Sequence, residues 1–160
     1  VRSLQLVSAS PGLATDVDRA GRVEDDETLA DRIEAGGVES FVDDWIEHPL
    51  FASQKRLPEP VRRRARDQRL VHSARGLANS LRGMGTGAMR PLHDELVSLP
   101  MPVSLMAGAL DPKFVAIAEA IELQPGWRRT IVDDCGHALY LEAASAVYLE
   151  AVTFQNGLRS

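Results

Sequence analysis

The hydrophobic positions of the chain predict one strand, then a long helical stretch, and then an alternation of strands and helices. The apolar run LQLV is followed by a cluster of serine, proline and glycine, which predicts a short strand over residues 3–9. From residue 15 to about 45, apolar residues recur at helical spacing among many charges, and the pair Gly36 and Gly37 interrupts them. This segment therefore predicts a helix that breaks at the two glycines.

The pattern stays helical as far as about residue 90. A second helix is predicted over residues 38–46, and after a loop that carries Phe51, Pro58 opens another helix that reaches about His72. Leu77, Leu81 and Met84 recur at helical spacing and predict a further helix over residues 77–84. This helix ends in a glycine-rich run. We therefore expect residues 14–90 to be almost entirely helical, with no paired strands.

Strands and helices alternate in the rest of the chain. After a short helix at 91–99, the expected elements are a strand at 103–107, a helix at about 114–123, a strand at about 129–132 and a helix at about 141–154. Such an alternation is typical of an α/β fold with parallel strands and flanking helices. The predicted organisation is a core strand and loop at 1–13, a helical segment at 14–90 and an α/β core at 91–160.

Composition narrows the class of protein. The chain has 160 residues, 44% of them hydrophobic, which suits one domain with a core. A net charge of -5 argues against a nucleic-acid partner, which needs a basic face. No apolar run is long enough to span a membrane, and the first residues do not resemble a signal peptide. With a single cysteine, Cys135, the expected location is the cytoplasm. Because the sequence opens on a strand without Met, we expect an upstream part to be missing.

Two polar residues follow predicted strands and are the best candidates for catalysis. Asp111 comes just after the strand at 103–107, and His137 comes just after the strand at 129–132. Open parallel sheets place their active sites at such strand ends. A carboxylate that accepts the Nδ1 proton of an imidazole leaves Nε2 free to act as a base. Alone, an aspartate in such a loop is more often a helix cap than a catalytic residue, but the order Gly-x-x-Asp and then Gly-His is the order of the acid and base of an α/β-hydrolase triad.

Other reactive side chains predict no further chemistry. Cys135 has no neighbour that would activate its thiol, so a packed structural cysteine is expected. The remaining histidines lack the spacing of a metal site, and neither a metal nor a cofactor is predicted. Ser8 and Ser10 lack the flanking glycines of a nucleophile elbow. The arginine run at 62–66 is interpreted as a solvated helix face.

Several segments resemble a known family in the same order and spacing. They are SASPGL at 8–13, DDW and PLFAS at 43–53, LRGMGTGAM at 81–89, GALDPKF at 108–114 and CGHALYLE at 135–142. These segments resemble the 2-succinyl-6-hydroxy-2,4-cyclohexadiene-1-carboxylate synthases of menaquinone biosynthesis, which have an α/β-hydrolase fold. The last two segments indicate only the superfamily, whereas the helical ones narrow the resemblance to this family. The resemblance implies that the chain corresponds to the carboxy-terminal part, with residues 14–90 as a helical lid.

The resemblance also implies roles for individual residues. Asp111 and His137 would be the triad acid and base, and Arg22, Trp45 and Arg69 would bind a small polycarboxylate substrate from the lid. Guanidinium groups suit this task because they bind carboxylates through two parallel hydrogen bonds. An aromatic residue typical of the family is replaced by Ile46. The nucleophilic serine of the family precedes the segment that begins at Val1, so the amino-terminal half of the enzyme is an expected partner.

The function implied is that of a lyase. It would eliminate pyruvate from 2-succinyl-5-enolpyruvyl-6-hydroxy-3-cyclohexene-1-carboxylate without a cofactor. Two alternatives remain open at the level of the sequence. One is an α/β-hydrolase that acts on a carboxylic ester or a carbon-carbon bond, because a triad alone does not distinguish these reactions. The other is an inactive truncated chain whose helices only bind a ligand or partner.

Overall fold

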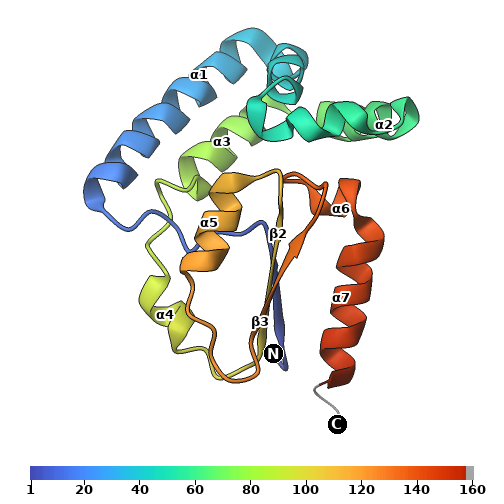
Figure 1. Ribbon diagram of the computed structural model, residues 1–160. Helices are drawn as coiled ribbons and strands as arrows, with labels where there is room; N and C mark the ends of the chain where they lie inside the picture. Colours follow the sequence, from blue (N-terminus) through green and yellow to red (C-terminus); the bar gives the residue numbers. More distant parts are fainter. Residues whose placement is uncertain (158–160) are drawn as a thin grey trace. The chain divides into compact units, whose positions relative to one another are not determined.

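A computed structural model describes residues 1–157 of the chain, which form two compact units. The first unit, the sheet unit, contains residues 1–10, 49–57 and those from 95 onward. The second, the helical unit, contains residues 11–48 and 58–94. Residues 49–57, which lie inside the predicted helical segment at 14–90, group with the sheet unit. Figure 1 shows the course of the chain through its elements.

The sheet unit is built on three parallel strands. They are β1 (Leu4–Val7), β2 (Val103–Gly108) and β3 (Arg128–Val132), in the order β1-β2-β3. Leu6 lies opposite Leu105, and Leu105 lies opposite Arg129. Because all strands run in the same direction, their carboxyl ends meet at one edge of the sheet. The two loops that carry the candidate catalytic residues therefore leave the sheet side by side.

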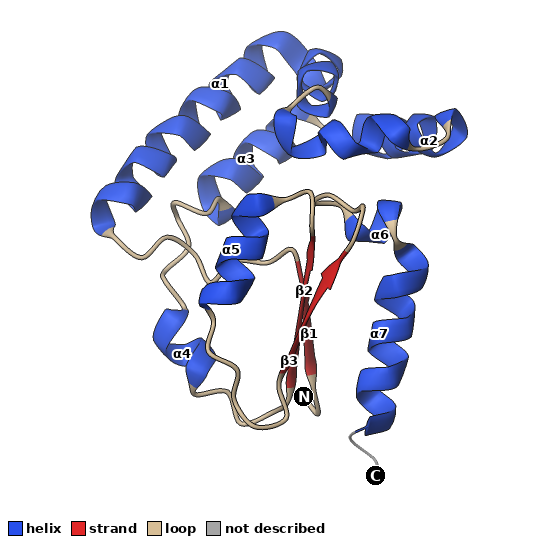
Figure 2. Cartoon of the chain, in the orientation of Figure 1, coloured by secondary structure: helices blue, strands red, loops and turns tan. Residues whose placement is uncertain are grey.

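Helices cover both faces of this sheet (Figures 1 and 2). One face has α5 (Pro112–Ala120), and the other has α7 (Ala144–Gly157), with the short α6 (Leu139–Glu142) before it. A further short helix, α4 (His93–Val97), precedes β2. This arrangement is that of the α/β class predicted from the alternating pattern.

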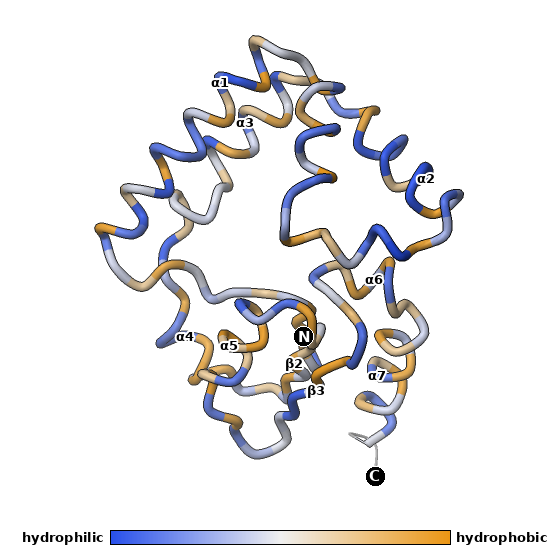
Figure 3. The backbone as a smooth tube through the Cα atoms, turned by 45° about the horizontal axis from the view of Figure 1, so that its top comes forward, coloured by the Kyte–Doolittle hydropathy of each residue, from blue (hydrophilic) through white to orange (hydrophobic). Residues whose placement is uncertain are grey.

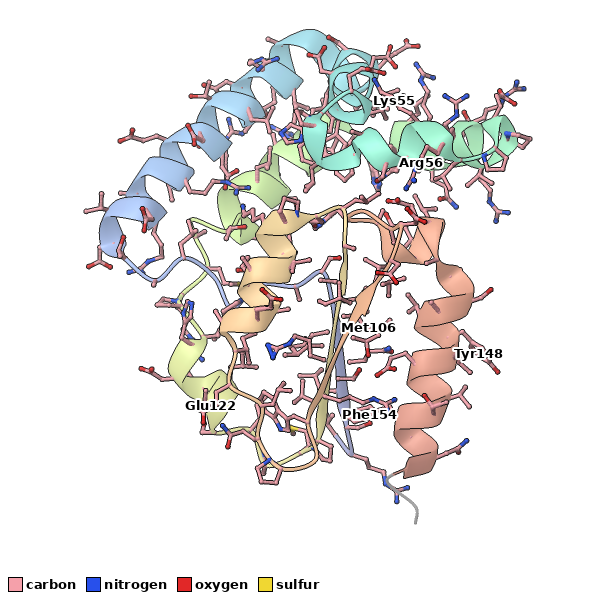
Figure 4. The ribbon with its side chains drawn as sticks, in the orientation of Figure 1. Lys55, Arg56, Met106, Glu122, Tyr148 and Phe154 are labelled. Carbon is pink, nitrogen blue, oxygen red and sulfur yellow. The ribbon has the colours of Figure 1, made fainter. Side chains whose placement is uncertain are left out.

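The central strand β2 divides the core into two layers. All six of its residues are buried, as expected for a strand covered on both faces. Val103 and Leu105 pack with Trp127 in one layer, while Met106 packs with Leu139 in the other. In Figure 4, Met106 of β2 and Phe154 of α7 lie between the strands and α7. Tyr148 lies on the opposite side of that helix. Successive residues of β2 therefore serve different layers.

The helical unit contains α1 (Asp16–Ile46), α2 (Glu59–Leu70) and α3 (Ala74–Met84). α1 has a kink at Gly37, whose φ of 82° suits glycine, as the glycine pair predicted. α1 packs against α3, where the Arg82 guanidinium donates to three carboxylates of α1: Glu27, Asp31 and Glu34. Hydrogen bonds from the guanidinium to the Glu34 and Glu27 carboxylates raise the pKa of Arg82. In Figure 3, α2 is largely hydrophilic, in agreement with its expected solvated arginines.

Most elements lie within a few residues of their predicted positions, and no strand occurs among residues 14–90. Two predictions were wrong. The expected loop around Phe51 is a 3-10 helix, η1 (Pro49–Arg56), in which Phe51 is buried. The expected helix at 141–154 starts earlier and is divided at Ala143, whose φ of -142° is not helical. Within residues 1–157, no helix is both long and apolar enough to cross a bilayer.

Candidate active site

Asp111 and His137 are in direct contact. His137 Nδ1 lies 2.8 Å from Asp111 Oδ2, although 26 positions separate the two residues in the sequence. The side chain of Asp111 is 1% exposed, whereas that of His137 is 24% exposed. The carboxylate therefore holds one ring nitrogen in the interior, and the imidazole keeps a path to solvent. The predicted contact between the two side chains is confirmed, while their catalytic role remains a prediction.

The two oxygens of Asp111 have different partners. Oδ1 accepts from the backbone N–H of Phe114 at 3.3 Å and caps α5, while Oδ2 binds the imidazole. Both interpretations of this residue therefore apply at once, since it is a helix cap and also the partner of the histidine. The cap restricts rotation of the carboxylate, which fixes the direction from which Oδ2 meets the ring.

Close packing of two loops brings the pair together. Ala109 N–H donates to Val132 O at 2.9 Å, and Leu110 N–H donates to Cys135 O at 2.9 Å. A Cβ at position 108 would overlap the carbonyl oxygens of Cys135 and Gly136. The loop after β3 therefore crosses the end of β2 at a distance that only glycine permits. The sequence contained this signal in the Gly-x-x-Asp motif, but the steric reason appears only in the structure.

Replacing Gly108 by Ala is expected to destabilise the sheet unit by about 2 kcal/mol or more, because the added methyl group meets backbone atoms that cannot rotate away. Urea denaturation of the parent and the variant measures this difference. Gly157→Ala is a matched control, since a Cβ there would meet no atom within 4 Å. Equal midpoints for Gly108→Ala and the parent would contradict the close approach.

Aromatic rings border the imidazole on two sides. The ring centroid of Phe114, from α5, lies 4.5 Å from that of His137, and the ring of Phe51, from η1, lies at 6.0 Å. Phe51 was predicted to lie in a loop and had no predicted role of its own. These apolar neighbours limit the orientations of the histidine ring and lower the local dielectric constant, which strengthens its interaction with Asp111.

The loop before His137 is held by polar contacts. The Arg56 guanidinium, from η1, donates to the backbone oxygen of Asp134 at 2.7 Å. The Gly136 N–H donates to Glu142 Oε2 at 2.9 Å. Asp134 has a φ of 52°, a left-handed conformation that aspartate adopts more readily than most residues. Neither Arg56 nor Glu142 was expected from the sequence to have a role at this loop.

Cys135 is buried beside this loop, as expected for a structural cysteine. Burial raises the pKa of its thiol, the Glu142 carboxylate raises it further, and Arg56 acts in the opposite direction. Because the thiolate is the nucleophilic form, a raised pKa makes this side chain unreactive.

The three residues with expected roles in substrate binding all lie in the helical unit. Arg22, in the first half of α1, donates through Nε to Oδ1 of Asp26 at 2.8 Å. The side chain of Asp26 is only 5% exposed, and its Oδ2 is buried without a hydrogen-bond partner among residues 1–157. The side chain of Arg22 is 39% exposed, and its inner nitrogen is held by this buried carboxylate, while its expected role in substrate binding remains a prediction.

Trp45 and Arg69 have separate surroundings. Trp45 follows the kink of α1, stacks with His48 at 5.8 Å and lines a hollow of about 270 Å³ together with Phe41 and Arg32. The Nη1 of Arg69 donates to the Ala65 carbonyl of its own helix at 2.9 Å. Neither Arg22 nor Arg69 lines the hollow beside Trp45. The expected convergence of the three side chains on one cleft remains a prediction.

Ser8 follows β1 at the same edge of the sheet as the candidate pair. Its φ is 44°, and its Oγ is buried without a hydrogen-bond partner in the part of the chain that the structure describes. The next helix starts only at Asp16. A nucleophile elbow needs an exposed hydroxyl on a turn that leads directly into a helix, so Ser8 does not have that geometry.

Three known proteins with similar sequences are named as 2-succinyl-6-hydroxy-2,4-cyclohexadiene-1-carboxylate synthases. A protein of Bacillus subtilis (strain 168), provisionally named 2-succinyl-6-hydroxy-2,4-cyclohexadiene-1-carboxylate synthase, is 43% identical over 143 residues, which are 89% of this chain and 52% of that protein. The synthase of Photorhabdus laumondii is 29% identical over 75% of this chain and 42% of its own length. No family model matches the chain.

Solved structures agree with these relatives. MenH from S. aureus aligns with the whole chain and with 60% of its own length, at a TM-score of 0.94 and 31% identity. An esterase from Thermogutta terrifontis aligns with 99% of the chain at a TM-score of 0.79 and 19% identity, a likeness of fold alone.

The parallel sheet, its flanking helices and these likenesses place the chain among the proteins of the α/β-hydrolase fold. Within that class, its sequence is similar to proteins named 2-succinyl-6-hydroxy-2,4-cyclohexadiene-1-carboxylate synthase, with 43% identity to the Bacillus subtilis protein. The chain spans about half the length of the curated relatives that it matches.

Proposed function

We propose that this chain is the part of a 2-succinyl-6-hydroxy-2,4-cyclohexadiene-1-carboxylate synthase that carries the acid and base. The complete enzyme would eliminate pyruvate from 2-succinyl-5-enolpyruvyl-6-hydroxy-3-cyclohexene-1-carboxylate in menaquinone biosynthesis, in the cytoplasm. The observation that carries the proposal is the 2.8 Å contact between His137 Nδ1 and Asp111 Oδ2. It occurs in a chain that is 43% identical to a relative named for this activity.

In this proposal the pair generates a base. Asp111 accepts the Nδ1 proton, which fixes the tautomer and leaves Nε2 free to take a proton from a serine hydroxyl. The activated serine removes a proton from a ring carbon of the substrate. The electrons of that C–H bond form a new C=C bond in the ring, the existing ring C=C bond shifts by one position, and the C–O bond to the enolpyruvyl group breaks. The enolate that leaves accepts at carbon the proton that His137 took from the serine, and it becomes pyruvate. No step requires a cofactor.

The helical unit would bind the carboxylates of the substrate. Arg22 suits this role because Asp26 holds its Nε and leaves its two terminal nitrogens without a hydrogen bond to residues 1–157. Arg69 is half-buried and is paired with no carboxylate in the same part of the chain. Trp45 would provide an apolar wall beside the substrate ring. Pairing of the carboxylates becomes more important as water leaves the site.

The nucleophile would come from a complementary half of the enzyme. β1 is an edge of the described sheet and pairs only with β2. An open edge of a parallel sheet is a template for another strand, and parallel sheets of three strands are small for this class. We propose that the complementary half pairs with β1 and places its serine near His137 Nε2.

Pyruvate release tests the proposal. The chain is assayed alone and after fusion behind the amino-terminal half of the Bacillus subtilis relative, with lactate dehydrogenase and NADH to detect pyruvate. We expect no release from the chain alone, because it lacks a serine elbow, and release from the fusion. Fusion to a half in which the elbow serine is replaced by alanine is the control.

Three outcomes would contradict the proposal in different ways. Pyruvate release by the chain alone would show that the account of the nucleophile is wrong. Hydrolysis of carboxylic esters by the fusion without pyruvate release would favour the hydrolase alternative. Binding of the substrate without turnover in every combination would favour an inactive binding chain.

A further inference from the structure

We propose that Glu142 is a positioning residue, which together with Ser53 clamps the loop that carries His137. This inference rests on the proposed function, in which His137 is the catalytic base. Glu142 lies at the end of α6 and does not touch the imidazole itself, so any effect on catalysis acts through the loop.

The first observation is the way in which the Glu142 carboxylate meets the loop. Its Oε2 accepts from the backbone N–H of Gly136, the residue directly before His137, at 2.9 Å. A charged acceptor makes this bond stronger than one between neutral groups. The bond closes a short ring of chain from 136 to 142, and His137 lies inside that ring. The backbone of the histidine is therefore fixed from both sides.

The second observation is a pair of buried oxygens beside the same glycine. Glu142 Oε1 and Ser53 Oγ are both buried, and neither has a hydrogen-bond partner among residues 1–157. A Cβ at position 136 would overlap the Ser53 hydroxyl and would lie 3.2 Å from Glu142 Oε1. Buried polar atoms that remain unpaired are costly. Because both unpaired oxygens border the same glycine, we infer that the Ser53 hydroxyl donates to Glu142 Oε1 in solution.

The third observation is that η1 contacts this loop at several points. Besides Ser53 beside Gly136, the ring of Phe51 lies 6.0 Å from that of His137, and Arg56 donates to Asp134 O at 2.7 Å. The residues 49–57 lie between two parts of the helical unit in the sequence, yet they belong to the sheet unit. Figure 4 labels Lys55 and Arg56, where η1 ends. The loop is thus held from two sides, by η1 and by Glu142. The inferred bond between Ser53 and Glu142 would join the two.

The clamp would affect the rate because His137 can accept the serine proton only when its Nε2 lies within hydrogen-bond distance of the hydroxyl. The contact with Asp111 fixes the Nδ1 side of the imidazole, but the height of the ring above the sheet depends on the backbone at 136 and 137. A displacement of about 1 Å in a catalytic group can reduce the rate roughly 100-fold. Loss of the Gly136 bond would release this backbone without removing any group that touches substrate.

The test compares Glu142→Ala, Glu142→Gln and Ser53→Ala in the complete enzyme formed by this chain and its complementary half. We expect Glu142→Ala to lower kcat about 10- to 100-fold with little change in KM, because positioning rather than binding is lost. Glu142→Gln keeps an acceptor for Gly136 N–H and should retain most of the activity. Ser53→Ala should have a smaller effect, about 2- to 10-fold.

A spectroscopic readout separates positioning from activity. An imidazole Nδ1 proton bonded to a carboxylate gives a far-downfield proton NMR signal, and loss of the signal in Asp111→Asn assigns it. We expect the signal to broaden or shift in Glu142→Ala and to recover in Glu142→Gln. The control is Glu150→Ala, which removes a carboxylate of similar burial on α7 that binds Ser104 and Arg128 and is remote from the loop. That variant should lose stability but keep both the signal and kcat.

The results have distinct meanings. Parent-like kcat and an unchanged signal in Glu142→Ala would overturn the clamp. Equal losses in Glu142→Ala and Glu150→Ala, in proportion to their loss of stability, would overturn it as well. If the NMR signal responds as expected but the parent enzyme releases no pyruvate, the clamp stands and the proposed function fails.

Discussion

Asp111→Asn is expected to lower kcat for pyruvate release by roughly 10³- to 10⁴-fold while leaving the fold nearly intact. The amide keeps an oxygen that can cap α5 in place of Oδ1, and asparagine caps helices about as well as aspartate. The other end of the amide would donate to His137 Nδ1. The imidazole would then carry its proton on Nε2, the nitrogen that has to act as the base. Steady-state kinetics and thermal denaturation measure the two effects separately.

Two further variants make this expectation specific. Asp111→Ala should lose the same activity and in addition about 1 kcal/mol of stability, because the cap of α5 is removed as well. Asp133→Asn changes an exposed acid next to the same loop and should behave like the parent. An Asp111→Asn enzyme with more than a tenth of the parent activity would show that the carboxylate does not set the tautomer, and the assignment of the pair would be lost.

Arg69→Ala is expected to raise KM strongly without loss of stability. Removal of one partner from a charge-assisted pair in a dry site costs roughly 2 to 5 kcal/mol, which corresponds to about 30- to 5,000-fold in affinity. The guanidinium of Arg69 donates only to a carbonyl of its own helix in the described chain, so folding depends little on it. Arg62→Ala, an exposed position on the same helix, is the control.

Arg22→Ala should weaken binding to a similar extent but should also destabilise the helical unit. Its removal leaves the buried carboxylate of Asp26 without its ion pair, at a cost of about 1 to 3 kcal/mol. The double variant Arg22→Ala/Asp26→Asn should regain part of the stability but not the affinity. If KM stays within about twofold of the parent in both Arg22→Ala and Arg69→Ala, roughly 0.4 kcal/mol, the proposed substrate is wrong even if the catalytic pair is right.

The sequence was sufficient to predict the contact between Asp111 and His137, because parallel strands bring their carboxyl ends to one edge of a sheet. It also predicted the kink of α1, because adjacent glycines interrupt a helical pattern and only glycine readily adopts a φ of 82°. Both inferences depend on rules that connect residue type to local geometry. They did not require knowledge of what lies opposite a residue in space.

The sequence could not reveal contacts between segments that are distant along the chain. η1 has no periodic pattern of its own, and its contacts with the histidine loop depend on tertiary packing across about 80 positions of sequence. The bond between Gly136 N–H and Glu142 could not be predicted, because a carboxylate at the end of a short helix is usually solvated. The burial of Asp26 was missed for the same reason, since it is one acid among many on α1.

The dual use of Asp111 and the tight crossing at Gly108 affect how distant copies of this chain should be interpreted. A descendant that had lost its enzymatic activity would still need the aspartate to start α5 and the glycine to let two loops cross. Selection for folding alone would therefore retain both residues of the Gly-x-x-Asp part of the motif. The partly exposed imidazole of His137 neither caps a helix nor permits a close crossing of loops, so this position would be free to change first. In a survey of such copies, a histidine at this position is the better marker of surviving catalysis, and the aspartate by itself marks only the fold.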